Sequence, residues 1–71
     1  MNYCYVLLDT MVEHTNRYGI AAVAVEDDVT VILESCIDLS LNREDAQLFV
    51  SLCNEHRLDI VHFWDAIDDF L

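Results

Sequence analysis

The stretch YGIAAVAVE, residues Tyr18–Glu26, decides the fold of this 71-residue chain. Its valines, isoleucine and tyrosine are typical of β-structure, so the stretch predicts a strand. A strand with one solvated face alternates apolar and polar residues, whereas this one is apolar on both faces. We therefore expect something to cover each face of the strand.

Two further stretches predict strands on either side of it in the sequence, namely YCYVLLDTMVE (Tyr3–Glu13) and VTVILESCI (Val29–Ile37). The polar segment HTNR, residues 14–17, is the predicted turn before the second strand, and EDD, residues 26–28, separates the second strand from the third. Short polar connections favour an antiparallel meander of order 1-2-3. Neither turn contains Asn-Gly or Asp-Gly, so the sequence leaves both registers open.

The second half of the chain predicts two helices. The first lies within DLSLNREDAQLFVSLCNEHR, residues 38–57, with Ser40 or Asn42 as the N-cap. Asp59 is the predicted cap of the second helix. That helix carries an apolar stripe at helical spacing, predicted to be core: Ile60, Phe63, Trp64, Ile67, Phe70 and Leu71. The predicted fold is a single α+β domain over residues 1–71, of order β-β-β-α-α, with both helices on one face of the sheet.

Two helices of about 12–15 residues, each about 20 Å long, cover one face of a three-stranded sheet and not two. The second apolar face needs another partner. A second copy of the chain is the simplest candidate, so we expect a homodimer.

The charge limits the possible partners. The chain has a net charge of −11, from 14 acids against three arginines, and the acids are spread along its whole length. Such a surface repels phosphates, which argues against direct nucleic-acid binding and against anionic membranes, and favours a basic protein partner. The odd number of cysteines, three, and an N-terminus without a basic leader region favour a cytoplasmic location.

No glycine-rich phosphate loop and no arrangement of serine, histidine and acid typical of catalysis is present. We expect a protein that is not an enzyme and needs no cofactor. His62, Asp65 and Asp69 share one ridge of the second helix and are weak candidates for a divalent metal, against the simpler interpretation of a solvated face. Cys53 and His56 form a C-x-x-H pair, for which a buried inert thiol is the simpler interpretation.

The end of the second helix raises an electrostatic question. Asp65, Asp68 and Asp69 crowd the predicted C-terminus, where the helix dipole is already negative. Burial of Ile67 and Phe70 lets the fold tolerate these charges but does not explain them. We hypothesise that the three aspartates, together with the neighbouring His62, bind an Arg/Lys cluster of a partner or, as a second choice, a divalent cation.

Three short segments, RYGI, LCN and VHFWDAIDDFL, resemble a family of small uncharacterised bacterial proteins, a domain of unknown function. The resemblance rests on a Tyr-Gly-Ile strand and a C-terminal His-x-x-Asp-x-x-x-Asp-Phe-Leu helix. Here the positions are Tyr18, Gly19, Ile20, His62, Asp65, Asp69, Phe70 and Leu71. The resemblance implies that His62, Asp65 and Asp69 are family features, and it implies no activity.

Taken together, the sequence predicts a small acidic interaction or regulatory module that associates with itself and binds a basic protein surface. An acidic inhibitor that mimics DNA is the alternative. Mimicry needs carboxylates spaced like phosphates along a strip, and the sequence spreads its acids more broadly. A divalent-metal-binding domain is the third and weakest interpretation.

Overall fold

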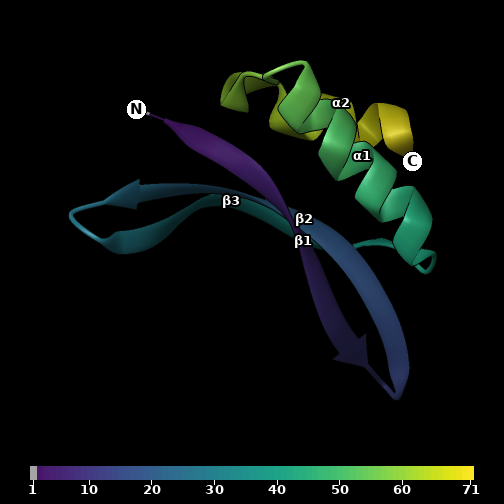
Figure 1. The fold of residues 1–71 in the computed structure, drawn as a ribbon. Coiled ribbons are helices and arrows are strands. Elements are labelled where there is room, and N and C mark those ends of the chain that lie inside the picture. The colour runs from purple at the N-terminus through teal and green to yellow at the C-terminus, as the bar shows by residue number, and fades with distance from the viewer. Residues whose placement is uncertain (1) are drawn as a thin grey trace.

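The computed structural model describes residues 2–71. The elements follow in the order β1 (Tyr3–Val12), β2 (Thr15–Glu26), β3 (Val29–Ser40), α1 (Arg43–Glu55), a short 3-10 turn η1 (Ile60–His62) and α2 (Phe63–Phe70). The strands form one antiparallel sheet of order β1-β2-β3, and both helices lie on one side of it (Figure 1). The predicted α+β class and its β-β-β-α-α order are confirmed.

Both hairpin turns are tighter than the sequence indicates. The turn between β1 and β2 is Glu13-His14, with φ of 50° and 66°, and the one between β2 and β3 is Asp27-Asp28, with φ of 50° and 65°. Two consecutive residues of positive φ give the primed turn that matches the twist of paired strands. The predicted HTNR turn is therefore wrong, because Thr15 already pairs with Val12.

Gly19, the chain's one glycine, lies where β3 bulges over β2. Ile20 pairs with Cys36 but Tyr18 pairs with Ser40, so β3 advances four residues while β2 advances two. A Cβ atom on Gly19 would lie 2.8 Å from the Cα atom of Ile37, and it would also meet the backbone carbonyl of Cys36. Backbone atoms cannot turn aside as a flexible side chain does, so the close approach requires glycine.

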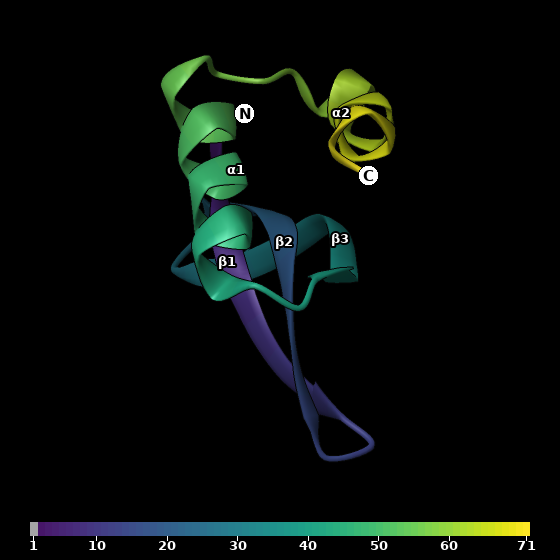
Figure 2. The same ribbon diagram turned by 90° about the vertical axis from the view of Figure 1, so that its right-hand side faces the viewer.

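The core fills the space between the sheet and the two helices. The sheet contributes Tyr5, Ile20, Ala22 and Leu39, and the helices contribute Ala46, Val50, Cys53, Phe63 and Ile67. Figure 2 shows α1 and α2 next to each other above the sheet, with α2 on the side of β3. The rings of Phe49 and Phe70 bridge the two helices with centroids 4.9 Å apart. The alanine on β2 lets the helices approach the sheet closely.

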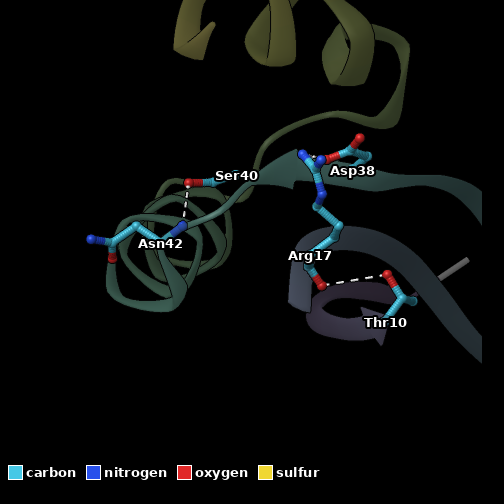
Figure 3. A network of polar contacts seen from close by, with 5 residues as sticks. All are labelled: Thr10, Arg17, Asp38, Ser40 and Asn42. Carbon is cyan, nitrogen blue, oxygen red and sulfur yellow. Dashed lines mark hydrogen bonds and ion pairs between the residues drawn. The ribbon is translucent and has the colours of Figure 1, made fainter. Parts of the chain in front are cut away.

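Side chains cap α1 at its start. Asn42 is the N-cap, since its Oδ1 accepts a hydrogen bond of 3.1 Å from the backbone N–H of Asp45. Ser40 is the other predicted N-cap. Its hydroxyl accepts a hydrogen bond of 3.0 Å from the backbone N–H of Asn42 and so helps to hold Asn42 in the capping position (Figure 3). At the other end Arg57, with φ of 50°, closes a Schellman turn in which Leu58 N–H donates to Cys53 O at 2.9 Å.

The second helix is shorter than predicted, and Trp64 lies outside the core. Asp59 caps η1 by accepting from Val61 N–H at 3.1 Å, and α2 begins only at Phe63. A helix that buries Phe63 and Ile67 turns Trp64 about 100° away from the sheet. The prediction that Trp64 is core is therefore wrong: it is 49% exposed, and its Nε1–H donates to Glu34 Oε2 at 3.2 Å.

Leu71, the last residue of the predicted apolar stripe, is also exposed. Ile60 and Phe70 are half-buried and pack against the edge of the core. Within residues 2–71 no helix is long and apolar enough to cross a membrane.

We predict that Gly19→Ala destabilises the protein by about 3 kcal/mol or more, because the added methyl group meets backbone atoms of β3. Ala24→Gly, on the same strand, is the control and should cost only about 1 kcal/mol. Denaturant unfolding measures both. A Gly19→Ala protein within 1 kcal/mol of the parent would show that β3 can move away from β2 at little cost.

Candidate functional site

His62 and the three aspartates of α2 are exposed, as expected, but their relation to the helix differs from the prediction. Because α2 begins at Phe63, Asp65 lies in its first turn, where the helix dipole favours negative charge. Asp68 and Asp69 lie in the last turn. The prediction that all three crowd the negative end is therefore wrong for Asp65.

The possible metal ligands do not come together as a set of three. His62 Nδ1 lies 4.0 Å from Asp65 Oδ2, and these residues are the N-cap and third residue of α2. This spacing is typical of a local interaction at a helix start. Among residues 2–71, no group of three or more His, Cys, Asp or Glu side chains is placed to hold a metal ion. The structure thus leaves Asp69 apart from the pair.

The C-x-x-H pair also separates. Cys53 is buried in the core, and burial raises the pKa of its thiol, so the neutral form is favoured. His56 is the exposed C-cap residue of α1. A neutral thiol inside the core fits the interpretation of Cys53 as an inert packing residue.

Tyr5 and Asn54 form a junction that no pattern in the sequence predicts. β1 is an edge strand, and the Asn54 side chain replaces the missing neighbour: its Oδ1 accepts from Tyr5 N–H at 2.7 Å, and its Nδ2 donates to Tyr5 O at 2.8 Å. The Tyr5 hydroxyl donates to Leu58 O at 2.6 Å, and its ring stacks on Phe63 with centroids 6.1 Å apart. The LCN segment, which contains Asn54, was the one available signal.

An open cavity of about 610 Å³ lies beside this junction, between β1 and the end of α1. Among the described residues its lining carries one cation, Arg57, and no carboxylate or imidazole. Burial raises the pKa of Tyr5 to about 12, and the charges of Tyr3, Cys53 and Asp59 add to the effect. The phenol is therefore a neutral donor in a structural hydrogen bond, not a base.

The face of the sheet opposite the helices is apolar and open. Successive residues of a strand point to opposite faces, so the contact of Ile20 and Ala22 with the core places Ala21, Val23 and Val25 on the other side. Val23 pairs with Cys4 and with Ile32, which is 63% exposed. Among residues 2–71 no helix or strand covers this face (Figure 1). We call it the open face; its apolar members are Cys4, Val6, Leu8, Val23, Val25 and Ile32, and the small side chain of Ala21 is buried among its neighbours.

The open face is also nearly free of charge. Strand alternation places Asp9, Glu26 and Glu34 on the helix side, and Glu13, Asp27 and Asp28 lie in the two turns, so that Asp38 is the one remaining acid of the strands. The charged groups at one end of the open face, Arg17 and Asp38, pair with each other at 3.4 Å (Figure 3).

The chain matches, over residues 1–71, the model of a protein family described as "Family of unknown function (DUF6514)". This confirms the resemblance to a family without a known function. No curated protein and no solved structure matches the chain.

Because Asp65 and Asp69 lie at opposite ends of α2, we predict that neutralising them has opposite effects. Asp65→Asn should lower the free energy of unfolding and Asp69→Asn should raise it, each by about 0.3–1 kcal/mol at low salt. Thermal unfolding at low and at 1 M salt checks this, and high salt should remove both effects. Shifts of the same sign would mean that the helix dipole does not control these charges.

We predict that Asn54→Asp costs about 1–3 kcal/mol at neutral pH, because a carboxylate cannot donate to Tyr5 O and repels it. A protonated carboxyl can donate, so the deficit relative to the parent should shrink below about pH 4. Denaturant unfolding of both proteins across this pH range is the measurement. A deficit of the same size at every pH would show that the loss does not come from the missing donor to Tyr5 O.

Proposed function

The chain belongs to the DUF6514 family of unknown function, and we propose that it is a non-enzymatic cytoplasmic interaction module that pairs with a second copy of itself. The observation that carries the proposal is the open face. An apolar sheet surface of β-branched residues is the kind of surface that packs against another sheet, about 10 Å away.

Charge favours a second copy as the occupant. Two chains of net charge −11 repel each other at most orientations. Two copies that pair through their open faces bring no unpaired carboxylates together, because the one acid of this face, Asp38, is paired with Arg17. In a two-fold arrangement the same patch serves both copies, so Val23 and Ile32 of each copy can face the same residues of the other.

Pairing through the open face would leave the acidic surface exposed on the outside of the dimer. A basic protein surface is the partner class that such a field attracts and orients. His62, Asp65, Asp68 and Asp69 remain our candidates for contact with its arginines and lysines. This gives the module two kinds of contact, one apolar with itself and one electrostatic with a partner.

We predict a dimer in sedimentation experiments at tens of micromolar, and its dissociation by Ile32→Glu. A carboxylate buried against apolar residues should raise the dissociation constant at least tenfold, which corresponds to about 1.4 kcal/mol. Val61→Glu on η1 is the matched control, because it makes the same charge change at an exposed valine outside the open face and should remain dimeric.

A parent protein that sediments only as an 8.2 kDa species would overturn self-association. Equal dissociation by Val61→Glu would show that added charge, and not the open face, controls the assembly.

A further inference from the structure

A second apolar surface lies on α1, on the side that faces away from the sheet. Ala46, Val50 and Cys53 form the buried side of this helix. At about 100° per residue, Leu48 and Leu52 lie roughly half a turn away from them. Leu48 is 60% exposed and Leu52 is 42% exposed.

Leu41, just before the helix, is also exposed and precedes Leu48 by seven residues. We call Leu41, Leu48 and Leu52 the leucine stripe. Leu48 and Leu52 are four residues apart and lie on one side of α1, whereas Leu41 precedes the N-cap Asn42 and lies just outside the helix. Single exposed leucines are common on protein surfaces, but two on the same solvent-facing side of a helix offer an apolar contact to another helix. None of the three belongs to the buried core.

Acids border the leucine stripe. Helical geometry places Glu44 and Glu55 along one side of it and Asp45 along the other. All three are exposed, and Arg43, the basic residue of α1, projects toward the buried side by the same geometry. The surface is therefore an apolar line between two negative borders.

We propose that the leucine stripe is the docking surface for a basic amphipathic helix of another protein, one with an apolar stripe flanked by lysine or arginine. Its leucines would pack on Leu48 and Leu52 while its cations face Glu44, Glu55 and Asp45. A helix fits better than an extended strand as the partner. The backbone N–H and C=O groups within α1 already bond to each other, so they cannot pair with the backbone of a strand.

This inference rests on the proposed function in one respect: it names the class of the basic partner and places its main contact on α1, with the aspartates of α2 as a secondary, electrostatic contribution. It does not depend on self-association, because α1 lies on the helix side of the sheet and the open face lies on the other (Figure 1).

The test uses the full chain and two synthetic peptides of about 20 residues. One is a leucine/lysine peptide whose leucines repeat at helical spacing, and the other is a scrambled peptide of identical composition. Calorimetric titration at 0.15 M salt should show the helical peptide binding at least tenfold more tightly than the scrambled one. Leu48→Ser with Leu52→Ser should weaken that binding at least tenfold without changing the net charge.

Two pairs of charge variants locate the contact. Glu44→Gln with Glu55→Gln removes two charges beside the leucine stripe, and Asp65→Asn with Asp69→Asn removes two charges on α2. The first pair should weaken binding several-fold more than the second. Thermal unfolding confirms that each variant is folded, and the single variant Leu48→Ser, with a several-fold loss expected, replaces the double one if that does not fold.

Equal binding of the scrambled peptide, or parent affinity in the leucine variant, would show attraction to net charge alone and overturn the inference. A larger loss from the α2 pair would place the partner on α2, which overturns the leucine stripe and leaves the proposed function standing. Sedimentation of the same samples reports self-association separately.

Discussion

The double hydrogen bond between the Asn54 amide and the backbone of Tyr5 is the contact on which the arrangement of the layers depends. It closes the outer edge of β1 and ties the end of α1 to the sheet, with bonds of 2.7 and 2.8 Å. The same tyrosine holds the chain after α1 through Leu58 O and supports α2 through its stacking on Phe63. Each such bond contributes about 0.5–1.5 kcal/mol net, which is a substantial share in a domain whose core supplies only a few kcal/mol.

With both helices on one side of the sheet, no helix or strand of residues 2–71 covers the other side. This explains why so small a protein exposes many large apolar side chains, and why they fall into distinct places. The open face of the sheet is apolar and nearly uncharged, whereas the leucine stripe of α1 lies between acids. We propose a copy of the same acidic chain for the first and a basic partner for the second, because electrostatic repulsion disfavours the approach of two acidic surfaces.

Much of the fold could be predicted because its signals are local. β-branched runs, a capping asparagine at Asn42 and apolar residues at helical spacing each act within a few residues. The errors arose where a distant contact overrides the local pattern. Trp64 shares its apolar spacing with Phe63 and Ile67, but the stacking of Phe63 on Tyr5 leaves Trp64, one residue later, about 100° away from the core. His62, Asp65 and Asp69 fit one helical ridge in sequence, yet the later helix start gives Asp65 a different electrostatic position.

The sequence by itself determined the order of the elements, the acidic surface and the excess of apolar residues, because composition and periodicity are properties of neighbouring residues. The tertiary structure alone decided the hairpin registers, the need for glycine at position 19 and the role of Asn54. Each of these depends on an approach between segments far apart in the chain: β3 passes over Gly19, and Asn54 reaches a strand 49 residues away. Their physical cause is a steric or hydrogen-bonding demand that exists only once the strands and helices have come together.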